Sequence, residues 1–202
     1  MGLTGKIALG CGGLIVLALV VLGLSVAGSY NSLNGLNQAV EAQWGQVENV
    51  YQRRSDLVPN LVATVKGAAA FEKDTFTAVT EARSKVGQVT TGKVPTDAAS
   101  LARFQQAQEG LGSALSRLMV VVEKYPDLKA TQNFRDLQAQ LEGTENRITV
   151  ERMRFNQAAQ AFNTRRNSFP TVIIAGFFGE RFRDKAYFKA QAGADQAPKV
   201  AF

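Results

Sequence analysis

An uncharged apolar run lies near the N-terminus of this chain, from Ile7 to Gly28, with the sequence IALGCGGLIVLALVVLGLSVAG. A helix rises about 1.5 Å per residue, so a run of this length spans roughly 30 Å, the thickness of a bilayer's hydrocarbon core. The residues that follow are of mixed polarity. The run therefore predicts a membrane-spanning anchor that places the rest of the chain at a membrane.

Three other interpretations of the run stay open. Ser25-Val26-Ala27 has the small-x-small form of a signal cleavage site, although the apolar region of a signal is usually shorter, about 7–15 residues. A buried helix of a soluble protein is the second, but such proteins rarely contain uncharged runs of this length. The third is a lipoprotein, since Ala8-Leu9-Gly10-Cys11 is similar to a lipobox. Most of the apolar stretch follows Cys11, however, whereas a lipobox should come after it.

The charges that flank the run predict its orientation. Lys6 and the α-amino group precede it. After it, the first charged residues are Glu41 and Glu48, and the first basic residue is Arg53. The positive-inside rule therefore favours a cytoplasmic N-terminus and an exported C-terminal domain.

The composition excludes several kinds of chemistry. The 202 residues include no His and one Cys, so an internal disulfide is excluded and the usual zinc, haem and copper sites lack their ligands. A Ser-His-Asp or Cys-His mechanism cannot be built, and no GxGxxG, P-loop or GxSxG motif is present. We predict no catalytic residue, cofactor, metal site or small-molecule substrate, and we expect a non-enzymatic protein.

The net charge of +6 is distributed unevenly. Residues 41–85 contain six basic and six acidic side chains, whereas residues 147–189 contain nine basic and three acidic ones. Basic chains often bind nucleic acid. Here the excess is modest, no known nucleic-acid-binding module is seen and the domain is expected to be exported, so we expect no nucleic-acid partner.

Four segments after the run show the three-four apolar spacing of helices, near residues 32–54, 60–86, 97–124 and 132–168. The row on the third segment is a regular heptad that one polar residue, Gln108, interrupts. The predicted fold is all-α, with a transmembrane helix followed by an antiparallel four-helix bundle of long helices and a short apolar and basic C-terminal extension. The expected divisions are a short N-terminal segment (1–6), the transmembrane helix (7–29), the bundle (30–169), the extension (170–188) and a disordered tail (189–202).

The connections between these segments carry recognisable signals. Gln88–Pro95 has Gly, Thr and Pro without periodicity, which predicts a loop, and Thr96 can cap the third helix. Thr131 can cap the fourth helix after the break at Tyr125–Asp127.

The join at Arg53–Leu61 (RRSDLVPNL) is ambiguous, because Pro59 disfavours helical geometry at Val58. The apolar spacing continues across the join, which favours a kinked helix. Matching the lengths of the four segments favours a tight turn, and we predict the turn.

The residues RRSDLVPNLVATVKG, from Arg53 to Gly67, resemble the LemA family of bacterial membrane-anchored proteins. The similarity continues in YPDLKATQNFRDLQAQLEGTENRI (Tyr125 to Ile148) and in shorter pieces as far as Tyr187-Phe188, and covers nearly all of residues 30–188. The resemblance implies an N-terminal anchor in the bacterial cytoplasmic (inner) membrane and a helical bundle. It implies no established enzymatic activity; some relatives are linked to membrane remodelling and others to stress or signalling.

A turn at Arg53–Asn60 would lie beside the Tyr125–Ala130 turn, at the end of the bundle far from the membrane. We therefore predict a distal patch that docks another protein, formed by Arg53, Arg54, Asp56, Asn60, Tyr125, Asp127 and Lys129. The alternative is structural: Asp56 and Asn60 cap helix ends and the arginines pair locally.

The other end of the bundle returns to the membrane with apolar and basic residues. The candidate lipid contacts are Val172, Ile173, Ile174, Phe177, Phe178, Arg181, Phe182, Arg183 and Lys185. Apolar groups would enter the interface, while each basic residue near an anionic surface contributes about 1 kcal/mol. The opposite interpretation, in which Phe177, Phe178 and Phe182 fold back to cap the bundle core, is equally open, and the two can coexist.

These features predict an interaction or assembly module that organises the membrane. The expected partners are the lipid bilayer and either further copies of the chain or another membrane protein. In the alternative, the chain is an accessory regulator or adaptor of another membrane protein and acts through the distal patch.

Overall fold

The computed structural model describes residues 3–67, 73–90, 92–95 and 97–189, with side chains from residue 12 onward. Its helices are α1 (Leu3–Lys66), α2 (Lys73–Val89), α3 (Ala98–Val122), α4 (Pro126–Lys129), α5 (Gln132–Asn167), α6 (Thr171–Phe177) and the 3₁₀ helix η1 (Gly179–Phe182). No strand occurs among the described residues, and the predicted all-α fold is confirmed. The predicted tail, apart from Lys189, lies outside the described residues.

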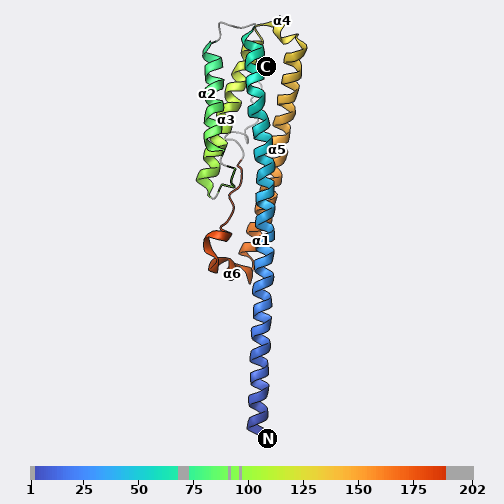
Figure 1. Ribbon diagram of the computed structural model, residues 1–202, viewed down its shortest axis with the longest axis vertical. Coiled ribbons are helices and arrows are strands. Elements are labelled where there is room, and N and C mark those ends of the chain that lie inside the picture. Colours follow the sequence, from blue (N-terminus) through green and yellow to red (C-terminus); the bar gives the residue numbers. More distant parts are fainter. Residues whose placement is uncertain (1–2, 68–72, 91, 96, 190–202) are drawn as a thin grey trace, which may run out of the picture.

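Helix α1 is 64 residues long, and its N-terminal part projects from the bundle as a single straight helix (Figure 1). The large apolar side chains between Leu14 and Leu24 are exposed. Among the residues from 12 onward, Ser29 is the first that is buried, so the bundle begins directly after the apolar run. In the part of the chain that the structure describes, α1 is the one helix long and apolar enough to cross a membrane.

The bundle is built from the C-terminal part of α1 with α2, α3 and α5. Helix α1 packs lengthwise on α5, and α2 packs on α3 (Figure 1). Side-chain contacts show that α1 and α5 are antiparallel: Ser32 bonds to Arg165, Gln43 to Glu151 and Arg54 to Glu145. The described helices therefore form the predicted antiparallel bundle, although their bounds differ from the prediction.

The four-helix arrangement is complete only in the distal half of the bundle. Helix α2 has 17 residues and α5 has 36, lengths of about 26 and 54 Å. In the proximal half, the chain after α6 packs where a longer α2 would lie. Phe182 and Phe188 enter this part of the core, and the Phe188 ring lies 5.4 Å from the Phe155 ring.

The predicted turn at Arg53–Leu61 is wrong, because α1 continues through Pro59 to Lys66. Pro59 has no N–H, so the Ser55 carbonyl loses its partner within the helix. Arg83 on α2 replaces that partner: its Nε donates to the Ser55 oxygen at 3.0 Å. Val58 and Leu61 are buried, so the uninterrupted apolar spacing was the correct signal and the matching of segment lengths was misleading.

We expect Arg83→Ala to lower the free energy of unfolding by about 1–2 kcal/mol, because it leaves the buried Ser55 carbonyl unpaired. Denaturant unfolding of the detergent-solubilised protein measures this, with the exposed Arg103→Ala as control. In a Pro59→Ala background the loss should shrink, since residue 59 regains an N–H. An equal loss in both backgrounds would show that Arg83 stabilises the fold in some other way.

The ends of the other helices follow local signals. Thr131 caps α5 as predicted, with its side chain accepting from the Phe134 N–H at 3.4 Å. Helix α3 is capped by Asp97, which accepts from the Ser100 N–H at 2.7 Å, rather than by the predicted Thr96, a residue outside the described set. The predicted loop follows the end of α2, where Gly92 has φ of 68° and donates its N–H to Glu48.

Candidate functional site

The membrane-proximal end of the bundle carries a row of exposed apolar side chains. Helix α6 turns Thr171 and Ala175 into the bundle, and the Phe178 ring lies 5.0 Å from the Tyr30 ring of α1. Phe169, Ile173 and Phe177 remain largely exposed, and Phe177 has an exposed fraction of 88%. Ile173 and Phe177 are four residues apart and so lie on one side of α6, and Phe169 lies just before the helix. We call these three residues the foot row.

The predicted lipid-facing set divides in two. Val172, Ile173 and Phe177 are exposed, whereas Phe182 is fully buried, with its ring 5.6 Å from Tyr30 and 6.5 Å from Phe162. The assignment of Phe182 to the lipid contact is therefore wrong, and the fold-back interpretation is correct for this residue. Gly179, with φ of 48°, allows the chain to turn from α6 back onto the bundle. Ile174 is half-buried, and Phe178 is exposed to about the same extent as Val172 although its ring packs on Tyr30.

The predicted basic contacts are partly engaged within the bundle. Arg181 is exposed but donates to Asn34 Oδ1 at 3.2 Å and lies over the Tyr30 ring. Arg183 pairs with Glu180. The Lys185 ammonium lies 4.9 Å from the centre of the Phe162 ring; burial lowers the pKa of this lysine, and the nearby Glu41 opposes that shift.

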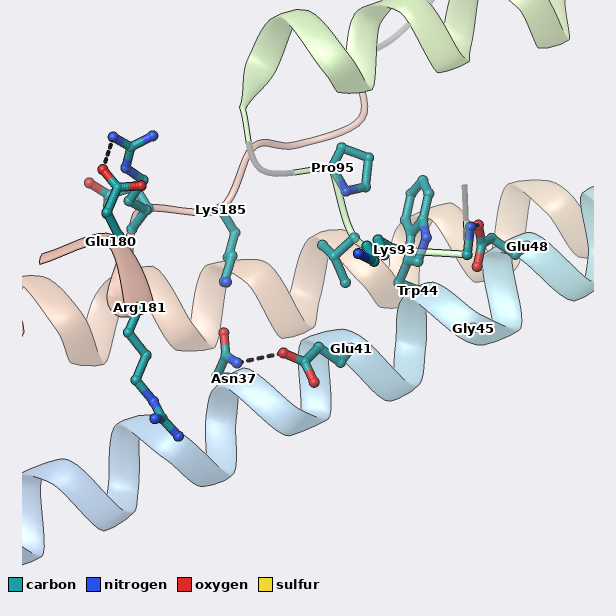
Figure 2. A pocket seen from close by; sticks show the side chains of 14 residues that line it. Asn37, Glu41, Trp44, Gly45, Glu48, Lys93, Pro95, Glu180, Arg181 and Lys185 are labelled. Carbon is teal, nitrogen blue, oxygen red and sulfur yellow. Dashed lines mark hydrogen bonds and ion pairs between the residues drawn. The ribbon is translucent and has the colours of Figure 1, made fainter. Parts of the chain in front are cut away.

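These three basic residues line part of a pocket of about 610 Å³ between α1, the loop before α3 and the chain after α6 (Figure 2). Its lining mixes carboxylates such as Glu41 with cations such as Lys185, and Asn37 donates to Glu41 at 2.7 Å. The buried Trp44 indole N–H has no partner among the described residues. No three His, Cys, Asp or Glu side chains in the described ranges gather closely enough to hold a metal ion.

The predicted distal patch does not assemble as one surface. Arg53, Arg54, Asp56 and Asn60 lie within α1, and Arg54 is about 18 Å from the end of the helix at Lys66. Tyr125, Asp127 and Lys129 lie at the distal turn, where Lys129 pairs with Glu123. Asp56 and Asn60 cap no helix end, because α1 continues past both.

The structure instead brings Arg54 into a buried polar cluster, which we call the Arg54 cluster, with Gln108 and Glu145. Arg54 Nη1 donates to Glu145 Oε1 at 2.9 Å, and Nη2 donates to both the main-chain and side-chain oxygens of Gln108. The Arg54 side chain is 5% exposed and that of Glu145 is 46% exposed. The neighbouring Tyr51 has its pKa raised by burial, and the charges of Arg152 and Arg54 oppose the shift.

The sequence contained a signal for this cluster that the distal-patch prediction missed. Arg54 lies between Tyr51 and Val58 in the same three-four apolar row, so its position belongs to the core. Gln108 similarly interrupts the apolar row of α3. A polar residue in each of two apolar rows indicates that the two side chains meet in the core and bond to each other.

The Arg54 cluster forms the floor of an open groove between α3 and α5, which we call the α3–α5 groove. Residues 105–119 of α3 form one wall, residues 141–152 of α5 form the other, and Tyr51 and Arg54 of α1 lie beneath. The groove encloses about 750 Å³. Arg54 Nε and Gln108 Nε2 are buried there without a partner among the described residues.

Comparison with known proteins agrees with this architecture. The LemA family model matches residues 43–202, most of the chain. The chain belongs to the LemA family. The match confirms the resemblance seen in the sequence and extends past Phe188, where that resemblance ended.

Similar LemA relatives include two proteins of Paramagnetospirillum magneticum, named Magnetosome protein MamQ 1 and MamQ 2, and the Magnetosome protein MamQ of Magnetospirillum gryphiswaldense. Each is 26% identical over 197 residues, an alignment that covers 89% of this chain and 72% of the relative. Family membership and the apolar helix together support a membrane-associated helical protein.

Proposed function

We propose that this LemA-family protein is a non-enzymatic, single-pass membrane protein whose bundle is an interaction and assembly module resting on the bilayer surface. The N-terminus would lie in the cytoplasm and the bundle on the outer side of the inner membrane. A reporter fused to the C-terminus tests the orientation, which the single Lys6 before the apolar run supports.

The observation that carries this proposal is the position of the foot row. Phe178, directly after α6, contacts Tyr30 of α1, which lies two residues after the end of the apolar run, a rise of about 3 Å. A bilayer that surrounds the run would therefore have its surface at the level of α6. Phe177 and Ile173 would enter the interface, where apolar side chains are stabilised, and Arg181 would lie near the headgroups.

Tryptophan quenching in proteoliposomes tests the contact. We expect the tryptophan introduced by Phe177→Trp to be strongly quenched by lipids brominated on their acyl chains, because its ring enters the interface. The single native tryptophan, Trp44, lies about 24 Å beyond the end of the apolar run and should give only a weak background signal.

Val120→Trp is the matched control, since Val120 is equally an exposed apolar residue but lies near the distal end of α3. Quenching of the two introduced tryptophans to the same extent would contradict contact between α6 and the bilayer.

Assembly is tested by the mass of the full-length protein in mild detergent. A large homo-oligomer supports an assembly module, and a monomer supports the alternative, an adaptor of another membrane protein. The adaptor no longer has the predicted distal patch as its docking surface, because Arg54 is buried and the remaining residues lie at two levels of the bundle.

A further inference from the structure

The described chain ends in an extended strap, residues 183–189, that runs from η1 along α5 toward the distal end (Figure 1). Two asparagines of α5 hold its backbone. Asn163 donates to the Lys185 carbonyl at 2.9 Å and accepts from the Lys185 N–H at 2.8 Å. Asn156 makes the same pair of bonds to Phe188, at 3.0 and 2.8 Å.

These two clamps define a register between the strap and α5. Asn163 and Asn156 are seven residues apart in a helix, a rise of about 10.5 Å, and Lys185 and Phe188 are three residues apart in an extended chain, a span of about 10 Å. The two spacings match, so both asparagines bond to the strap backbone in the same geometry. The strap is thus straight and antiparallel to α5. The next position in this row of α5 is Thr149, which lines the α3–α5 groove.

The last described residue lies at the mouth of that groove. The Lys189 carbonyl accepts from Arg152 Nη2 of α5 at 2.7 Å and from Gln105 Nε2 of α3 at 3.1 Å. Gln105 and Arg152 belong to the two walls of the groove, so the strap enters between them.

The groove has hydrogen-bonding capacity that the described residues leave unused. The buried Gln108 Nε2 and Arg54 Nε are donors without a partner there, and backbone carbonyls are the acceptors that an extended chain carries. Part of the wall formed by α3 consists of residues with small side chains, Gly112, Ser113 and Ser116. Residues 190–194 are Ala-Gln-Ala-Gly-Ala, mostly small enough to pass beside them.

We propose that the strap continues past Lys189 and that the C-terminal segment of the same chain docks in the α3–α5 groove above the Arg54 cluster, with residues 190–196 inside the groove. The thirteen residues are long enough, since the wall from Gln105 to Met119 measures about 21 Å, the span of six or seven extended residues. The LemA family match also includes this segment, to residue 202. The groove is then a docking site for the chain's own C-terminal segment.

The register predicts which side chains meet. Five extended residues after Lys189 span about 16 Å, the rise of about eleven residues of helix, which places Ala194 level with Ser116 of α3. Ser116 is exposed and its hydroxyl bonds only within its own helix, to the Gly112 carbonyl, so a cysteine there leaves the fold intact.

Disulfide cross-linking of the full-length protein in detergent tests the proposal, in a Cys11→Ala background that removes the native thiol. We expect Ser116→Cys with Ala194→Cys to form an intramolecular disulfide faster, on the order of tenfold, than Arg117→Cys with Ala194→Cys. Arg117 is the matched control because it is adjacent and exposed but lines a different surface of α3, toward α2.

A second pair, Thr149→Cys with Gln191→Cys, tests the register on α5 independently, with Arg147→Cys on the opposite side of the helix as its control. Equal rates for test and control pairs would overturn the proposal. A disulfide that joins two chains, seen as a dimer on a non-reducing gel, would also overturn it and assign the groove to the segment of a second copy.

Discussion

Phe182→Ala is expected to lower the free energy of unfolding by about 3–5 kcal/mol, because the ring is fully buried and its removal leaves a cavity. The ring contacts Tyr30 of α1, Phe162 of α5 and Phe178, and so fastens the chain after α6 to the two longest helices. Denaturant unfolding of the detergent-solubilised protein measures the loss.

Phe177→Ala is the matched control, since the same residue type five positions earlier is 88% exposed. Its free energy of unfolding should change by less than about 0.5 kcal/mol. The two variants should differ in what they lose. Phe177→Ala should weaken the contact between α6 and the bilayer, whereas the main effect of Phe182→Ala should be a loss of unfolding free energy. Equal losses of stability would contradict the division of the two rings between lipid and core.

Arg54→Ala is the second substitution for which we expect a large effect, a loss of about 3 kcal/mol of unfolding free energy. It removes the donor that bonds the buried main-chain and side-chain oxygens of Gln108 and the partner of Glu145. Arg53→Ala is the control, because the adjacent Arg53 is exposed and should contribute less than about 0.5 kcal/mol.

Two further variants separate charge from volume in the Arg54 cluster. Arg54→Met keeps most of the packing volume and removes the buried charge, so we expect it to lose less stability than Arg54→Ala. Glu145→Gln keeps an oxygen acceptor for Arg54 Nη1 and should lose about 1 kcal/mol. A loss for Arg53→Ala as large as that for Arg54→Ala would show that burial does not distinguish the two arginines.

The error at Pro59 shows where sequence reasoning reached its limit. A proline within a helix is normally disfavoured because it leaves a carbonyl unpaired. Here the pairing comes from Arg83, 28 positions away and on another helix. No residue within Arg53–Leu61 indicates that bond. Because the turn was wrongly predicted there, Arg54, Asp56 and Asn60 were assigned to a distal patch that the fold does not form.

Sequence reasoning was limited in the same way at the proximal end of the bundle. Phe177 and Phe182 are alike in type and lie in similar apolar and basic surroundings in the sequence. The turn at Gly179 and the short length of α2 determine which ring is exposed. Because α2 is short, the proximal half of the bundle has room for Phe182 and Phe188. Those are properties of the assembled bundle.

Local and periodic patterns in the sequence were sufficient to predict several features. These are the apolar run, the all-α fold, the LemA membership and the Thr131 cap, since helical periodicity and capping depend on residues a few positions apart. The passage of α1 through Pro59, the burial of Phe182 and the Arg54 cluster became evident from the three-dimensional structure. Each depends on partners brought together from distant segments, as with Arg54 and Glu145, 91 positions apart, and it is packing that determines whether such groups are buried and paired.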